Sequence, residues 1–159
     1  MQKLELLAPN LIIVLIQLVN NQKICKLINH NSPNALDQPD LILPQNSLIN
    51  NKVFPFPFPI NFQGEECTNI RVYYPRVDFK NNEVVIDEEI WFDIVCANNL
   101  WLIPGTVRPY LIASEIVNIF RRKSIETLGR MQFITMLHVR INENYDAIRL
   151  IAKIVQYNN

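Results

Sequence analysis

Apolar residues near the N-terminus recur with the spacing of an α-helix. The pattern begins at Pro9 or Asn10 and continues to Ile28, and a proline is tolerated in a first helical turn because its missing N–H has no helical partner there. We therefore predict one helix over this stretch. Ile12, Ile13 and Ile16 widen its apolar sector beyond one stripe. Such a helix needs cover on most sides, either by deep burial or by the sheet on one side and a neighbouring subunit on the other.

Residues 29–66 are rich in turn-forming residues and prolines, so we expect a long loop or arm. Residues 47–52 have room for one helical turn. Residues 54–59 alternate phenylalanine and proline. Proline has no N–H to donate to a sheet, which predicts an extended, polyproline-like arm and not a strand. The arm either packs on its own core or lies on an adjacent subunit.

A two-residue period begins at Asn69 and predicts an antiparallel hairpin. Residues 69–74 form its first strand, which Pro75 ends or bulges, and Asn81-Asn82 makes the turn. Residues 83–96 then form one long strand or two in tandem. One face of this hairpin is apolar, and the other, solvated or subunit-facing, is more mixed. The apolar face carries Ile70, Val72, Tyr74, Ile90, Phe92, Ile94 and Cys96, and the mixed face carries Arg71, Tyr73, Trp91, Asp93 and Val95.

The last third of the chain predicts a second helix and two more strands. The helix runs from Pro109 to about Arg122 and ends in a basic cluster, Arg121-Arg122-Lys123, which suits a helix C-terminus or, as the alternative, a phosphate or nucleic-acid contact. The strands cover residues 131–140 and 147–155, with Met131, Phe133, Thr135, Leu137 and Val139 on one face. We therefore predict a single α+β domain over residues 1–159. It has an antiparallel sheet of about four strands, two main helices on one face, and residues 29–66 as an extended arm.

Composition favours a protein that binds other proteins. Lysine plus arginine and aspartate plus glutamate number 15 each, so the net charge is zero and there is no basic footprint for nucleic acid. Charged residues make up 19% of the chain, below the roughly 25% of typical domains, which suggests that a partner covers part of the surface. The apolar run at residues 11–18 is shorter than the ~20 residues that span a bilayer, and we expect no membrane association.

Residues that carry chemistry are scattered along the chain. Three glycines are too few for a glycine-rich phosphate loop. The three cysteines, Cys25, Cys67 and Cys96, lack a CxxC spacing, so we expect free thiols in a reducing compartment. His30 is predicted to cap a helix end, and His138 to lie on the polar face of its strand.

The one acidic run is Asp87-Glu88-Glu89, with Glu83 and Asp93 near it. We interpret this run as a solvated hairpin face, with a divalent-cation site as the alternative. We predict no catalytic, cofactor-binding or metal-binding residues, and therefore no enzyme. The competing hypothesis is a metal-dependent enzyme that uses these acids and His138.

Several stretches resemble small neck and tail proteins of tailed bacteriophages, the tail-terminator and head–tail connector group. They are residues 92–103, followed by Arg108-Pro109-Tyr110, then residues 128–133 and residues 145–151, and the resemblance in layout covers residues 11–155. It implies a non-enzymatic subunit of a ring of six or twelve copies in the virion neck, assembled in the bacterial cytoplasm. The implied partners are portal or adaptor proteins and tail proteins, with genomic DNA passing through the lumen without sequence-specific binding. Terminator, stopper and portal adaptor remain alternatives.

A ring contact of this kind joins two different patches on each subunit, and large aromatic side chains are the usual anchors. We predict that the apolar N-terminal helix and the Phe-Pro arm supply these patches. The predicted interface residues are Ile12, Ile16, Phe54, Phe56, Phe58, Trp91 and Trp101. The alternative is a binding module that docks a host or virion protein through the Phe-Pro arm.

Overall fold

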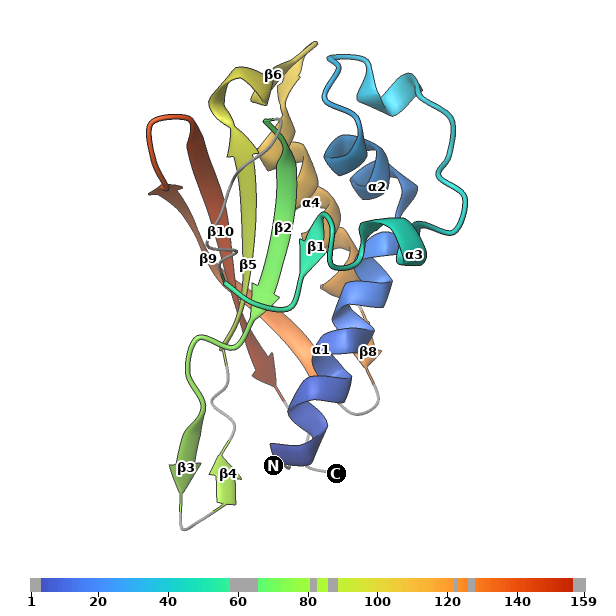
Figure 1. The fold of residues 1–159 in the computed structure, drawn as a ribbon. Coiled ribbons are helices and arrows are strands. Elements are labelled where there is room, and N and C mark those ends of the chain that lie inside the picture. The colour runs from blue at the N-terminus through green and yellow to red at the C-terminus, as the bar shows by residue number, and fades with distance from the viewer. Residues whose placement is uncertain are drawn as a thin grey trace.

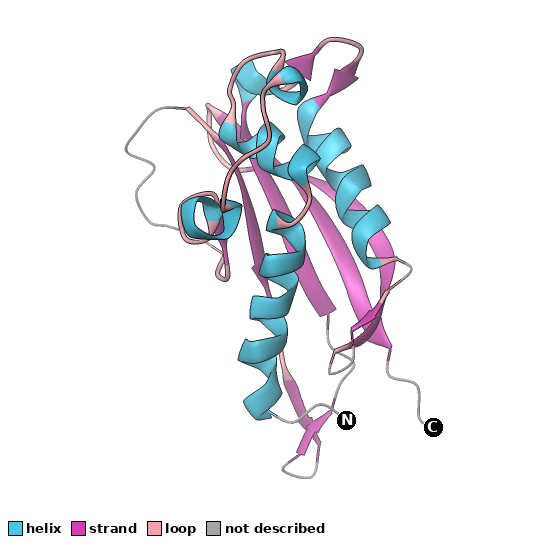
Figure 2. Ribbon diagram, turned by 90° about the vertical axis from the view of Figure 1, so that its right-hand side faces the viewer, coloured by secondary structure: helices cyan, strands magenta, loops and turns pink. Residues whose placement is uncertain are grey.

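The computed structural model describes residues 4–57, 66–80, 83–85, 89–121, 123–125 and 128–155. A layer of helices covers one face of a curled sheet, as Figures 1 and 2 show from two directions. The helical elements are α1 (Leu4–Val19), α2 (Gln22–Asn29), η1 (Ala35–Asp37), α3 (Pro44–Leu48), η2 (Asn98–Leu100) and α4 (Arg108–Phe120). The strands are β1 (Val53–Phe54), β2 (Thr68–Tyr73), β3 (Asp78–Lys80), β4 (Glu83–Val85), β5 (Glu89–Ala97), β6 (Leu102–Ile103), β7 (Thr106–Val107), β8 (Ser124–Ile125), β9 (Gly129–Arg140) and β10 (Tyr145–Val155). The predicted α+β class is confirmed.

The main sheet has six strands in the order β1-β2-β5-β10-β9-β8. Every neighbouring pair is antiparallel except β1 and β2, which are parallel. The expectation of about four strands was too low because β1 and β8 have two residues each, too few for a two-residue period to be visible. The four long strands are those that the sequence predicts.

The predicted N-terminal helix is in fact two helices, α1 and α2, which meet at 83°. The polar side chain of Asn21 causes the break, since its Oδ1 accepts a hydrogen bond from the Ile24 N–H at 3.0 Å and begins a new helix. Pro9 lies inside α1 and not in its first turn. His30 is the C-cap of α2, as predicted. In the described part of the chain no single helix is long and apolar enough to cross a membrane, although α1 and α2 taken together reach the length and composition.

The predicted arm, residues 29–66, packs against its own chain over much of its described length. It contains η1 and α3, so the helical turn lies at Pro44–Leu48 and not at residues 47–52. Its β1 strand pairs with Ile70 and Arg71 of β2, which corrects the prediction that no strand forms there. The two prolines after β1, Pro55 and Pro57, end the pairing because they lack the N–H that a ladder needs.

The hairpin that follows is divided into two stages. β2 pairs with β5 and β3 pairs with β4, so residues 83–96 are two strands in tandem, one of the two readings of the sequence. β2 ends at Tyr73, close to Pro75. The predicted Asn81-Asn82 turn lies outside the described residues. Figure 1 shows β3 and β4 extending away from the body of the molecule.

The core lies between the helices and one face of the sheet. Its members are buried apolar residues of α1, α2, α4 and the four long strands, among them Leu15, Leu18, Ile24, Ile70, Phe92, Ile94, Ile112, Ile116, Phe120 and Leu150. Phe92 and Phe120 bring β5 and α4 together, with ring centroids 5.6 Å apart. Each such side chain contributes roughly 1.5–3 kcal/mol through burial.

A buried arginine fastens the helical layer at its upper end. Arg108, at the start of α4, is 1% exposed. All five of its N–H groups are directed at backbone carbonyls. The acceptors are Leu100 at 2.9 Å, Leu27 at 2.7 Å, His30 at 2.9 Å, Ser32 at 2.9 Å and Asn31 at 3.5 Å. Arg108 therefore stabilises the C-terminal end of α2 and the loop that follows it.

Candidate subunit interfaces

The sheet face opposite the helices carries a compact charged network. Asp93 of β5 is 5% exposed and accepts from Arg149 of β10 at both carboxylate oxygens, at 2.7 and 3.0 Å. The hydroxyl of Tyr73 donates to the same carboxylate at 2.6 Å. Burial, followed by the bond to Asp93, raises the pKa of Tyr73, so its phenol stays protonated and donating at neutral pH. The bidentate guanidinium balances the charge of the carboxylate and the phenol donates a further hydrogen bond to it, so the network holds three central strands in register.

Trp91 lies directly beside this network. The Arg149 guanidinium sits 4.4 Å from the Trp91 ring centroid, and the Tyr73 ring packs against it edge-on at 6.0 Å. The Trp91 Nε1–H donates to Glu89 at 3.0 Å. The predicted interface residue Trp91 is thus half-buried and held rigidly, which is the condition of a side chain that can anchor a partner at low entropic cost.

The Phe-Pro arm reaches the same face through Arg71. This arginine is fully buried in β2, and its Nη1 donates to the Pro57 carbonyl at 2.8 Å while its Nε donates to Asn69 at 3.1 Å. Burial lowers the pKa of Arg71, and the Asp93 charge opposes that effect. Phe54 and Phe56 pack together with ring centroids 5.5 Å apart, yet Phe56 remains 40% exposed. Phe58 lies outside the described residues.

Trp101, the other predicted tryptophan, lies in a different place, near the start of α4. Its indole Nε1–H donates to the Cys96 carbonyl at 3.1 Å. Tyr110 contacts its edge, and the His138 imidazole stacks on it at 5.4 Å. His138 in turn pairs with Asp146 at 2.6 Å. The structure therefore does not bring Trp91 and Trp101 together.

His138 lies on the helix side of the sheet because β9 contains a bulge. Pairing with β10 shifts between Ile151 and Ala152, which leaves Ile134 as an extra residue. Before the bulge, Met131 and Phe133 face the helices. After it the faces exchange, so Leu137 lies opposite Arg149 and Val139 opposite Ala147. The predicted common face for Thr135, Leu137 and Val139 with Met131 and Phe133 is therefore wrong, and so is the expectation that His138 shares the face of Gln132, although its side chain is exposed.

The exposed side of α1 forms a separate apolar surface. Ile12 is 47% exposed and Leu4 is more exposed still, while Ile16 is half-buried. Of the predicted interface residues, Ile12 and Ile16 thus share one helix, Phe54 and Phe56 share the arm, and the two tryptophans stand apart. The prediction grouped these residues into two patches, and the structure places Trp101 apart from Trp91.

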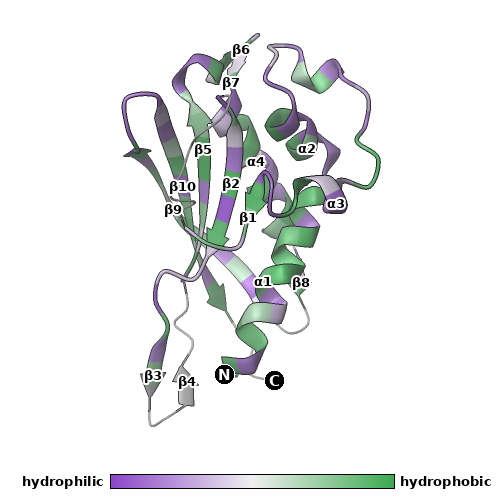
Figure 3. Cartoon of the chain, in the orientation of Figure 1, coloured by the Kyte–Doolittle hydropathy of each residue, from purple (hydrophilic) through white to green (hydrophobic). Residues whose placement is uncertain are grey.

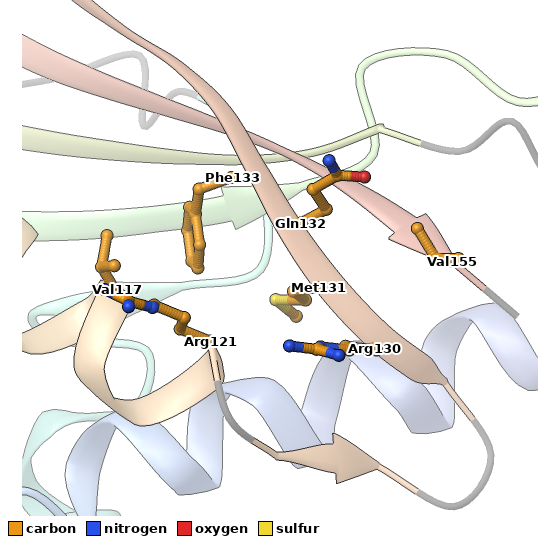
Figure 4. Close-up of a pocket in the computed structure, with 7 residues that line it drawn as sticks. All are labelled: Val117, Arg121, Arg130, Met131, Gln132, Phe133 and Val155. Atoms are coloured by element: carbon orange, nitrogen blue, oxygen red, sulfur yellow. The ribbon is translucent and has the colours of Figure 1, made fainter.

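A groove runs between α4 and β9. Its larger cavity, of about 570 Å³, is lined by Val117, Arg121, Arg130, Met131, Gln132, Phe133 and Val155, and Figure 4 shows the α4 side chains facing those of β9. An adjoining cavity of about 370 Å³ continues toward Tyr110 and Met136. Arg121 is the C-cap of α4, as predicted for the basic cluster, and Arg122 lies outside the described residues.

The predicted acidic and thiol groups are placed as follows. Asp87 and Glu88 lie outside the described residues, and in the part that is described no three His, Cys, Asp or Glu side chains gather as a metal site would require. Cys25, Cys67 and Cys96 are free thiols. Burial raises the pKa of Cys25 and of Cys96 to about 11, which keeps both as uncharged thiols at neutral pH.

Sequence reasoning missed that Arg71, Asp93 and Arg149 lie side by side on one face of the sheet. Each of the three is a single charged residue in the middle of an apolar strand, and Figure 3 shows such hydrophilic positions within β2. That signal was visible, since an isolated charge in a strand core needs a partner. The choice of partner was not visible, because it depends on the strand register.

Comparison with known proteins relates the chain to a protein family. The family model named YomW matches residues 21–154, which cover α2 and all of the six-stranded sheet except the last residue of β10. No curated protein and no solved structure matches the chain. YomW is the name of an SPbeta-type phage protein. The chain therefore belongs to the YomW family and is a phage-related protein.

Proposed function

We propose that the protein is a structural subunit of a phage particle, and that copies of it form a ring of six or twelve in the neck, between the portal and the tail. Its partners are further copies of itself, the portal or adaptor protein and tail proteins, and DNA passes through the lumen without sequence-specific contacts. Tail terminator and head–tail adaptor are the two positions that fit such a ring. Membership of a phage-related family supports this context.

The observation that carries the proposal is the presence of two different apolar surfaces on one chain. One is the outer side of α1, with Ile12; the other is the Phe-Pro arm with Phe56, near the Trp91 network. A cyclic ring is built from heterologous contacts, in which one patch of each subunit meets a different patch of the next. Exposed aromatic and aliphatic side chains on a rigid support are suitable anchors for such contacts.

The test is assembly in the presence of the particle's own proteins. We expect the chain, coexpressed with the portal and tail proteins of its phage, to form rings in electron micrographs and to be found in purified particles by mass spectrometry. Ile12→Ser and Phe56→Ser should each reduce ring formation by at least tenfold. Leu102→Ser, at an exposed position in the separate β6–β7 hairpin, is the matched control and should assemble normally. Absence from purified particles, with no ring in coexpression, would overturn the proposal.

A second candidate is a binding module that docks a host or virion protein through the Phe-Pro arm. The exposure of Phe56 on an otherwise anchored arm is the observation that favours it. Phe56→Ser then abolishes capture of that protein while ring assembly continues. Loss of both together supports the ring proposal instead.

A further inference from the structure

β9 leaves one long side of the sheet open. It has 12 residues, of which only Gly129 and Arg130 pair with β8. Along Met131–Arg140, no strand in the described part of the chain pairs with β9 on the side away from β10. Residues 134–138 are exposed without interruption, and the side chains of Ile134, Met136 and Leu137 are 49%, 48% and 44% exposed. A free backbone edge therefore coincides with three large apolar side chains.

Such an edge is a template for another strand, because its N–H and C=O groups are unpaired. Proteins usually block these edges with lysine, proline, inward-pointing charges or a covering segment. Residues 132–139 contain no lysine, proline, aspartate or glutamate. The bulge at Ile134 is the one protective device, and it leaves the run after it free. The chemistry of the edge calls for an extended strand as its occupant.

The opposite edge of the same sheet cannot supply that strand. β1 has two residues, its neighbour Ile49 forms a bridge to Val53, and the Asn50 N–H donates to the Val53 carbonyl at 2.9 Å. Prolines 55 and 57 follow at once. Two copies of the chain thus cannot join head to tail through their sheet edges, and the remaining edge-to-edge arrangement is β9 against β9.

We propose that two copies of this chain pair through β9, antiparallel and about a two-fold axis, so that the two six-stranded sheets become one continuous sheet. Centred on Leu137, the pairing sets Met136 opposite His138 of the second copy and Thr135 opposite Val139. These opposed residues lie on the same face of the sheet, as antiparallel pairing requires. Arg140 then faces Ile134 and not another arginine.

The run that pairs carries no lysine, arginine, aspartate or glutamate from Gln132 to Val139, so a second copy meets no like charge along it. β8 pairs with Gly129 and Arg130 on the same edge, so the contact between the two copies ends before these residues.

This contact goes beyond the proposed ring. A two-fold contact is isologous, and a single cyclic ring has heterologous contacts only. The β9 pair is therefore a form of the free protein, in which the open edge is covered before other particle proteins are met. It is measured without those proteins, whereas the ring is tested in their presence, so one proposal can fail while the other stands.

The test measures the mass of the purified full chain by analytical ultracentrifugation over a range of concentrations. We expect a species of twice the 18.6 kDa of one chain. Leu137→Lys places a charge in the centre of the pair and should weaken dimerisation at least a hundredfold. Ile42→Lys, at an 88% exposed loop position, is the matched control and should leave the dimer intact. A monomeric wild type, or a dimer that Leu137→Lys does not weaken, would overturn the proposal.

Discussion

The two edges of the six-stranded sheet are built in different ways. At the β1 edge, a two-residue strand is bridged by a tight turn, followed by prolines, and fastened from behind by Arg71. At the β9 edge, a long strand stands uncovered in the described structure, with apolar side chains on both faces. The short edge depends on contacts within the chain, and the long edge depends on contacts that the chain alone does not provide. The first should therefore be sensitive to changes in stability and the second to changes in association.

The strongest test of this difference places an aspartate in each edge of the sheet. Val53 is fully buried in β1, so Val53→Asp should lower the free energy of unfolding by about 3 kcal/mol, the cost of burying an unpaired carboxylate. Ile134→Asp, on the exposed part of β9, should change it by less than about 0.5 kcal/mol. Urea unfolding at a concentration where the chain is monomeric measures both. Equal losses at the two positions would show that the edges do not differ.

A smaller effect is expected from removing the guanidinium of Arg71, which binds the arm next to the β1 edge. Arg71→Ala leaves the Pro57 carbonyl and the Asn69 side chain without the bonds they receive in the native chain, and should cost about 2 kcal/mol. Amide hydrogen exchange should accelerate at Ile70, whose N–H donates to the Lys52 carbonyl at 2.8 Å, before it accelerates in β10. Arg140→Ala, on exposed β9, should leave exchange in the β1–β2 region unchanged. An unchanged exchange rate at Ile70 in Arg71→Ala would show that this arginine does not stabilise the β1 edge.

The smallest effect concerns the prolines. Pro57→Ala keeps the carbonyl that Arg71 binds but frees the backbone and restores an N–H group. We expect a loss of about 0.5 kcal/mol, chiefly through the greater entropy of the unfolded chain. Thermal unfolding of Pro57→Ala beside Pro39→Ala, a proline of the preceding loop, measures the difference. A loss above about 1.5 kcal/mol would assign the proline a packing role that its exposure does not indicate.

The sequence predicts the long elements well, because strands of six to 12 residues and a 13-residue helix repeat their period often enough to be recognised. Prediction from the sequence fails where a single residue ends a helix or shifts the register of a strand. Asn21 ends a helix that the apolar pattern continues through, and Ile134 exchanges the faces of β9. The candidate interfaces divide in the same way. The rigid aromatics Trp91 and Trp101 are named from composition alone, but their separation depends on the strand register. The open β9 edge follows from the strand order, which periodicity does not contain.

Arg108 has a consequence for how the chain folds. Its bonds to Leu27 and His30 join residues 81 and 78 positions apart, and contacts over such distances form late because a long loop must close first. During synthesis α1 and α2 emerge early, but the arginine that fixes the end of α2 emerges after two thirds of the chain has been made. Until then, the apolar N-terminal helices lack the contacts that α4 makes with them in the folded chain. The end of α2 therefore gains its final contacts only after α4 has left the ribosome and Arg108 has reached its five carbonyls.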